Sequence, residues 1–181
     1  MDRYPPIAYH GMVGDLQTAA LVSSGGNVDR WCTPRFDSPS VSAALLDSER
    51  GGHCRLAVEL PDGHGDGMSV RQLYPSDTAI LITRFMGPGG VGEVADLMPP
   101  IDSSVPTDRH RLIRVARVVR GSLPFAFACR PRFDYGRARH TLRVVDDHTA
   151  VLHGPGQDLQ PALRRARPDG APRTHGRGHR R

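Results

Sequence analysis

The sequence predicts an all-β protein: an antiparallel β-sandwich with one short helix and a disordered C-terminal tail. Two observations support this fold class. Glycine and proline together make up about a fifth of the 181 residues, which is typical of a fold rich in turns. Short runs of the chain also alternate apolar with polar or small residues, and turn residues separate these runs. Together the patterns indicate many short antiparallel strands rather than a helical bundle.

The individual strands are predicted from this alternation. It is clearest over residues 54–60 and 125–130, where every second side chain is apolar. Eight further runs fit the pattern: 17–23, 27–32, 68–74, 78–85, 91–98, 112–119, 139–146 and 149–153. Glycine-rich turns are predicted between strands at 24–27, 62–67 and 87–90. The last of these has no phosphate-binding motif, so we interpret it as a hairpin loop.

The one helix is predicted at residues 38–46. Ser38 can cap its N-terminus, and Pro39 suits the first helical position. The residues from Val41 to Leu46 supply an apolar stretch. We therefore expect a short helix to interrupt the strands here.

The domain is expected to end near residue 159. Residues 160–181 contain seven arginines and one acid, so they hold more positive charge than the net +5 of the whole chain. Residues 1–159 are therefore near neutral, and no basic face indicates a nucleic-acid partner. The tail lacks apolar periodicity, and we expect it to be disordered. Its abrupt start suggests an out-of-frame or truncated reading of a longer gene; nucleic-acid binding by the tail is a rival interpretation.

Several other classes of site are disfavoured. The three cysteines Cys32, Cys54 and Cys129 are widely spaced, so a disulfide framework or a zinc site is not expected and each is interpreted as a small buried residue. No metal or cofactor is predicted. The N-terminus has no signal-peptide core, and no apolar run is long enough to cross a membrane. The sequence thus predicts a cytoplasmic protein with no membrane partner.

Carboxylates that could serve in catalysis all lie beside turns or strand ends. By residue type the candidates are Asp15, Asp29, Asp37, Asp96 and Asp134. Aspartate at such positions commonly accepts hydrogen bonds from backbone N–H groups. We therefore expect structural roles for them and predict no catalytic residue.

The most informative segment is residues 29–40, which contains the only tryptophan and two prolines. Arginine and aspartate flank Phe36, and the same tetrapeptide Pro-Arg-Phe-Asp recurs at 131–134. An aromatic side chain between opposite charges suits a structured loop or an interface. A match of four residues can be coincidence, so no internal repeat is inferred.

With these residues the chain resembles the N-terminal domain of glycoside hydrolase family 15, in its bacterial trehalase-like and glucoamylase-like branch. The similarity extends to about residue 158 and is specific as an ordered set. The matching stretches are 6–15, 18–22, 25–29, 34–40, 43–47, 51–53, 96–100, 120–121 and 132–136.

The resemblance implies a β-sandwich that precedes an (α/α) barrel. In such enzymes two glutamates of the barrel cleave the α-glucosidic bond as general acid and base. The three glutamates here, Glu49, Glu59 and Glu93, match none of the barrel motifs, so no catalytic role is carried over. We expect a non-catalytic domain that packs against the barrel and helps shape the mouth of its active site.

The expected contact is the loop from Trp31 to Ser40. Its predicted interface or active-site-rim residues are Trp31, Pro34, Arg35, Phe36, Asp37 and Ser38. Two alternatives remain: a stand-alone carbohydrate-binding or scaffolding domain with an α-glucoside as ligand, and a subunit that partners a separately encoded barrel.

Overall fold

The computed structural model describes residues 5–59, 67–102 and 104–164. In these ranges the chain forms thirteen strands and one 3-10 turn, η1 (Ile7–Tyr9). The strands are β1 (His10–Gly14), β2 (Ala19–Ser23), β3 (Val28–Cys32), β4 (Ser40–Ser42), β5 (His53–Val58), β6 (Ser69–Leu73), β7 (Leu81–Gly87), β8 (Gly90–Leu97), β9 (Ile113–Gly121), β10 (Phe125–Arg130), β11 (Thr141–Asp146), β12 (Thr149–Gly154) and β13 (Gln157–Leu159).

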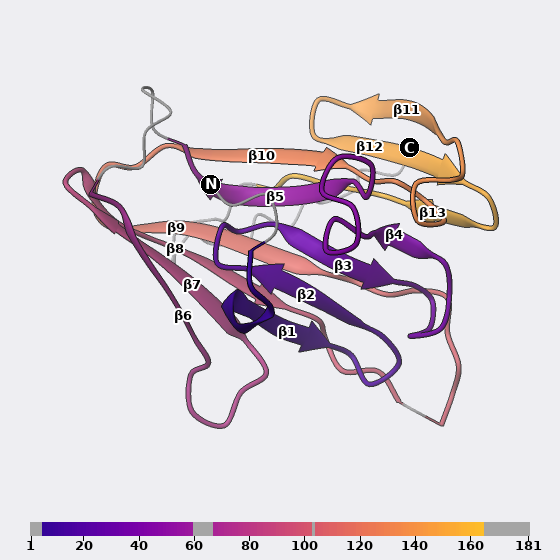
Figure 1. The fold of residues 1–181 in the computed structure, drawn as a ribbon, viewed down its shortest axis with the longest axis horizontal. Coiled ribbons are helices and arrows are strands. Elements are labelled where there is room, and N and C mark those ends of the chain that lie inside the picture. The colour runs from indigo at the N-terminus through magenta and orange to yellow at the C-terminus, as the bar shows by residue number, and fades with distance from the viewer. Residues whose placement is uncertain (1–4, 60–66, 103, 165–181) are drawn as a thin grey trace, which may run out of the picture.

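The strands form two facing layers and a small appended sheet (Figure 1). One layer is the antiparallel sheet β1-β2-β3-β4, continued by the pair β5-β10. Leu56 on β5 donates its backbone N–H to the carbonyl of Gly26 in the β2–β3 turn, which joins the two parts. The other layer is the antiparallel sheet β6-β7-β8-β9. The sheet β11-β12-β13 lies at one end, so the fold is the predicted all-β sandwich.

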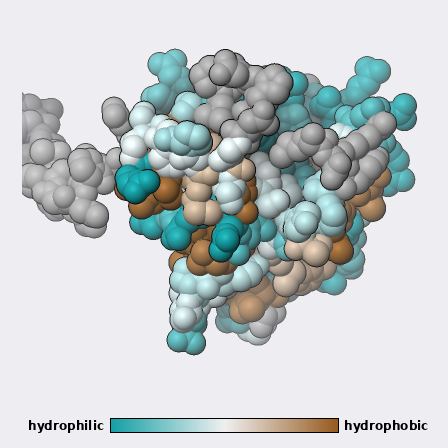
Figure 2. Space-filling view, turned by 60° about the vertical axis from the view of Figure 1, so that its left-hand side comes forward, coloured by the Kyte–Doolittle hydropathy of each residue, from teal (hydrophilic) through white to brown (hydrophobic). Residues whose placement is uncertain are grey.

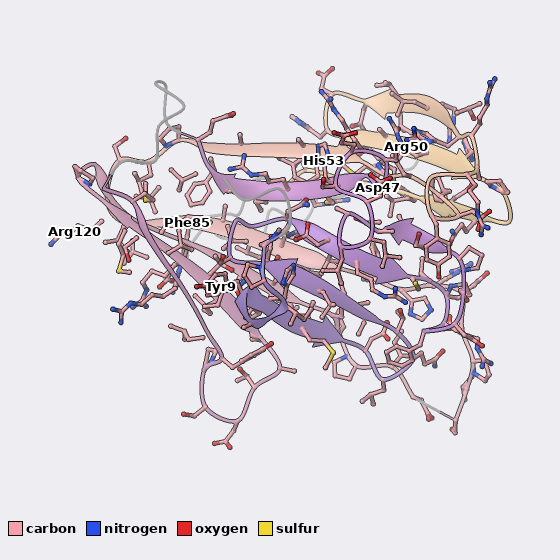
Figure 3. The ribbon with its side chains drawn as sticks, viewed as in Figure 1. Tyr9, Asp47, Arg50, His53, Phe85 and Arg120 are labelled. Atoms are coloured by element: carbon pink, nitrogen blue, oxygen red, sulfur yellow. The ribbon has the colours of Figure 1, made fainter. Side chains whose placement is uncertain are left out.

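The core fills the space between the two layers. One cluster joins Val13, Val22 and Trp31 of the first layer to Leu81 of the second. A second cluster joins β5 to the opposite sheet through Phe85, which is labelled in Figure 3. The period-2 alternation read from the sequence thus separates the side chains that enter this core from those that leave it.

All ten strands predicted from the alternation are confirmed. Three further strands, β1, β4 and β13, were not predicted. Two glycines in five residues weaken the pattern in β1, and the other two are only three residues long. These strands form because their backbones complete existing sheets, which is a tertiary effect.

The predicted helix at 38–46 is wrong. The Ser38 hydroxyl accepts a hydrogen bond from the backbone N–H of Arg35, which precedes it, so it does not cap a helix. Residues 40–42 pair with β3 instead, and one turn follows in which Leu46 bonds to the carbonyl of Ala43. The apolar run is therefore divided between a strand and a turn.

Two of the predicted turns are confirmed, and the third lies mainly outside the described residues. The turn at 24–27 joins β2 to β3 and places Gly26 at a φ of 76°, which glycine adopts without strain. The β7–β8 hairpin pairs Gly87 with Gly90 across a two-residue loop. Near the end of the described chain, Leu163 donates to the carbonyl of His148. The remainder of the predicted tail lies beyond the described part.

The described residues include no helix long and apolar enough to span a membrane. Figure 2 brings the left-hand side of Figure 1 forward, and on the visible face apolar groups are interrupted by hydrophilic and neutral ones.

Candidate domain interface

The loop between β3 and β4 projects from the end of the sandwich as an ordered, amphipathic turn. Phe36 at its tip is 60% exposed. Beside it, the Arg35 guanidinium donates a 3.0 Å hydrogen bond to the Asp37 carboxylate, and this bond lowers the pKa of Asp37. Ser38 closes the loop by hydrogen-bonding to the backbone of Arg35 in both directions. The aromatic ring is thus held outward by local hydrogen bonds.

Three other loops lie beside this one. The Thr18 hydroxyl of the β1–β2 turn donates to the carbonyl of Cys32, where β3 ends. In the same turn, Gln17 donates its side-chain amide to the carbonyls of Asp102 and Val105, at 2.9 Å each. The loop after β10 joins through Tyr135, whose backbone N–H bonds the Ser40 hydroxyl at 2.9 Å. In Figure 1 this end is at the right of the molecule.

Each loop contributes one large exposed apolar side chain, and we call these four the rim surface: Leu16, Phe36, Val105 and Tyr135. Their exposed fractions are 67%, 60%, 59% and 37%. Single exposed apolar residues are ordinary, but a group held on four interlocked loops is a feature of binding surfaces. The arrangement suits contact with another protein surface.

Backbone conformation also distinguishes the rim surface. The described residues include four non-glycine positions with positive φ. Three of them lie in the loops that carry the rim surface: Leu16 at 80°, Asp134 at 51° and Tyr135 at 55°. Such conformations cost free energy and concentrate at functional positions. Unfavourable backbone angles therefore occur in the same loops that carry the exposed side chains.

A buried histidine–aspartate pair supports the rim surface from below. His110 Nδ1 lies 2.6 Å from Asp15 Oδ2, and both side chains are almost fully buried. Asp15 also accepts the backbone N–H groups of Gln17 and Thr18. Burial raises the pKa of Asp15, but the bond from His110 and the two backbone bonds outweigh it, so the pKa lies below its ordinary value. The pair fixes the β1–β2 turn to the loop before β9.

Stability is expected to fall in acid because of this carboxylate. The pKa of Asp15 is lower in the folded than in the unfolded chain, so its contribution is present above the unfolded pKa, about 4, and is lost as pH falls through the folded value. Asp15→Asn should flatten the dependence of unfolding free energy on pH between about 5 and 2. Urea titrations over that range measure the effect. The exposed Asp108→Asn is the control, and equal slopes in both variants would contradict the prediction.

The six residues predicted for the interface fall into three groups by exposure. Phe36, Arg35 and Asp37 are exposed at the loop tip, whereas Pro34 and Ser38 are half-buried at its base. Trp31 lies in the core beneath, 7% exposed. Sequence reasoning missed the other three members of the rim surface, because only tertiary hydrogen bonds bring their loops to this end.

The two Pro-Arg-Phe-Asp segments place their phenylalanines differently. The backbone N–H of Asp134 donates to the Ser40 carbonyl at 2.9 Å, so the second segment lies against β4. Phe133 is fully buried against Val41 and Leu152, while Phe36 is exposed. The same tetrapeptide therefore places its phenylalanine in the core in one case and on the surface in the other.

The buried carboxylates of the described chain are all engaged in structural pairs. Besides Asp15, the Asp29 carboxylate contacts His10 Nε2 at 2.9 Å, and Glu93 lies between two arginines of its sheet. Asp96 binds Arg114 through both of its oxygens. Asp15 accepts hydrogen bonds from two backbone N–H groups, whereas Asp96 pairs with the side chain of Arg114. Glycoside hydrolysis requires two carboxyl groups that can reach substrate, about 5–10 Å apart, and these four point instead to protein partners.

A cavity of about 440 Å³ lies at the other end of β2 and β3. Tyr9 and His53, both labelled in Figure 3, contribute to its lining with Asn27, Asp29 and Arg55. Burial, and then the charges of nearby arginines, lower the pKa of His53. The lining combines one aromatic ring with several polar groups, which is a composition that can hold a small polar ligand. No three His, Cys, Asp or Glu side chains of the described residues gather as metal ligands would.

The architecture is that of an antiparallel β-sandwich domain. The chain belongs to the family described as trehalase-like, N-terminal, whose family model matches residues 2–160.

Individual relatives are named trehalases. The chain is 37% identical to a trehalase of Mycolicibacterium smegmatis over 153 residues, covering 76% of this chain and 22% of the relative. It is 31% identical to a trehalase of Mycobacterium tuberculosis over 160 residues, covering 83% and 23%. Trehalase 1 of Sulfolobus acidocaldarius is 36% identical over 144 residues, covering 79% and 22%. The chain thus spans less than a quarter of the length of these relatives. No solved structure matches it significantly.

Proposed function

We propose that this chain is the non-catalytic N-terminal domain of a trehalose-hydrolysing glycoside hydrolase, and that its rim surface packs against the catalytic domain. The observation that carries the proposal is the group of exposed apolar side chains on four interlocked loops. Membership of the trehalase-like family supports it, since the relatives extend well beyond the matched region. The catalytic partner is an (α/α) barrel, on the same polypeptide or a separate one.

The rim surface suits such a contact chemically. An apolar centre flanked by charged groups resembles the core and border of a protein interface. At the border of the rim surface, the opposite charges cancel within the Arg35–Asp37 pair and within the Asp134–Arg137 pair. An approaching surface therefore meets little net charge from these pairs. Aromatic side chains contribute most to such contacts, which favours Phe36 and Tyr135 as the main anchors.

A binding and activity assay tests the proposal. The domain is mixed with Mycolicibacterium smegmatis trehalase from which the matching N-terminal region has been removed, and both affinity and trehalose hydrolysis are measured. We expect association and a gain of activity on mixing, and no hydrolysis by the domain alone. Phe36→Asp should weaken association by at least tenfold, since it places a charge in a desolvated contact.

The control is Leu142→Asp. Leu142 on β11 is 61% exposed, against 60% for Phe36, but it lies outside the rim surface. Association that responds equally to both substitutions, or hydrolysis by the isolated domain, would contradict the proposal.

A second candidate function is carbohydrate binding by the domain alone, and the cavity beside Tyr9 favours it. An aromatic ring can stack on a sugar while Asn27, whose side-chain oxygen has no partner, accepts a hydroxyl hydrogen bond. Titration with trehalose and maltose, followed by NMR, distinguishes the two functions. Shifts confined to the cavity and lost in Tyr9→Ala would support the second.

A further inference from the structure

Cys54 and Cys129 occupy directly opposite positions on the paired strands β5 and β10. Glu59, just after β5, donates its backbone N–H to the carbonyl of Pro124, just before β10, whereas Leu56 donates to the Gly26 carbonyl of the β2–β3 turn. Backbone N–H and C=O groups point alternately to the two sides of a strand, so those of Cys54 point away from β10, as those of Leu56 do. Cys54 and Cys129 are therefore a non-hydrogen-bonded pair of the antiparallel ladder. At such pairs the side chains approach most closely across the strands.

This geometry is compatible with a disulfide. Non-hydrogen-bonded partners have Cα atoms about 4.5 Å apart. The Cα separation in disulfides is usually about 4.4–6.8 Å, so the pair needs no large backbone movement to close. Both residues are half-buried, and they are direct partners in the register of the two strands. Cys32 differs, since it is buried and its sulfur contacts the Tyr135 hydroxyl.

The surroundings make Cys54 the nucleophile of the pair. The hydrogen bond from the Cys129 thiol and the nearby Arg114 guanidinium on β9 lower the pKa of Cys54 to about 7, against the opposing effects of burial and of Asp96 on β8. The same hydrogen bond, in which Cys129 keeps its proton, raises the pKa of Cys129. The arrangement therefore pairs a thiolate with a neighbouring thiol, as two-step thiol oxidation requires.

We propose that Cys54 and Cys129 are a peroxide-reactive modification site that closes to a disulfide within the domain. The Cys54 thiolate attacks one peroxide oxygen, the O–O bond breaks, and the leaving hydroxide takes a proton to become water. Cys54 is now a sulfenic acid. The Cys129 sulfur then attacks the Cys54 sulfur, the S–O bond breaks, and the departing hydroxide leaves as water with the Cys129 proton. Two thiols are oxidised, and one hydrogen peroxide is reduced to two waters.

The disulfide would tie together distant parts of the chain. The two cysteines lie about 75 residues apart in sequence, with strands of both layers between them. Closing so long a loop restricts the unfolded chain and stabilises the folded one. Oxidation is expected to raise the melting temperature by roughly 5–15 °C.

Hydrogen peroxide treatment of the full 181-residue protein tests the inference. The readouts are the number of thiols that a maleimide labels after denaturation, the intact mass and the melting temperature. We expect the labelled thiols to fall from three to one with loss of two hydrogen atoms, a peptide pair linked through Cys54 and Cys129, and reversal by dithiothreitol.

Three variants make the result specific. Cys32→Ser should still lose both remaining thiols, whereas Cys54→Ser and Cys129→Ser should form no intramolecular link; circular dichroism first checks that each is folded. Peroxide that converts Cys54 to sulfinic acid in the wild-type protein without a link would overturn the proposal. So would a link that involves Cys32, or one that forms only between molecules.

Discussion

Asp96→Ala is expected to lower the free energy of unfolding by about 3–5 kcal/mol. Asp96 is fully buried, and it accepts hydrogen bonds of 2.6 and 3.2 Å from Arg114, whose side chain is only 6% exposed. Removing the carboxylate leaves the guanidinium buried without its carboxylate partner. Urea unfolding followed by the fluorescence of Trp31, the only tryptophan, measures the loss.

The exposed pair at the rim is the matched control. Asp37→Ala removes a carboxylate from an arginine pair in which both side chains are more than two-thirds exposed, so its effect on stability should be under about 1 kcal/mol. A loss under about 1 kcal/mol for Asp96→Ala as well would contradict the prediction. It would mean that the two carbonyl partners of Arg114 suffice to stabilise its buried guanidinium. Complete unfolding of Asp96→Ala would agree with the prediction, since domains of this size are stable by only about 5–15 kcal/mol.

The expected loss of unfolding free energy is large because Arg114 joins four parts of the sandwich. From β9 it binds Asp96 on β8, the Cys54 carbonyl on β5 and the Gly26 carbonyl of the β2–β3 turn. These partners belong to both layers. The side chain therefore fixes how the layers meet, in addition to neutralising a buried acid.

Most of the strands could be predicted from sequence because a two-layer sandwich imposes one alternation on every strand. The helix at 38–46 failed for a physical reason: local preference for a cap and an apolar run was overridden by pairing of Ser40 and Ser42 with β3. The Arg114 contacts could not be predicted, because its partners are as far as 88 positions away.

The candidate interface was predictable only in part. The segment around Phe36 was recognised from its composition, but composition does not tell which apolar side chains remain exposed. Leu16, Val105 and Tyr135 join it only because hydrogen bonds such as that from Gln17 to Val105 draw their loops together. No local pattern in the sequence signals that proximity.

Phe133→Ala is expected to destabilise the domain by about 3–5 kcal/mol. The ring is fully buried between Val41 of β4 and Leu152 of β12, and it contacts the imidazole of His140 edge-on at 5.6 Å between ring centroids. Its removal leaves a cavity where the appended sheet meets the first layer. Urea unfolding measures the change in free energy.

Phe36→Ala is the matched comparison, since the same tetrapeptide surrounds both phenylalanines. Phe36 is 60% exposed, so its truncation should change the unfolding free energy by less than about 0.5 kcal/mol while weakening association with the catalytic domain. Phe133→Ala should show the opposite pattern, in which the main effect is a lower free energy of unfolding. Similar stability losses in both variants would mean that the Phe36 ring packs against the domain itself, and the rim surface would then lose its main anchor.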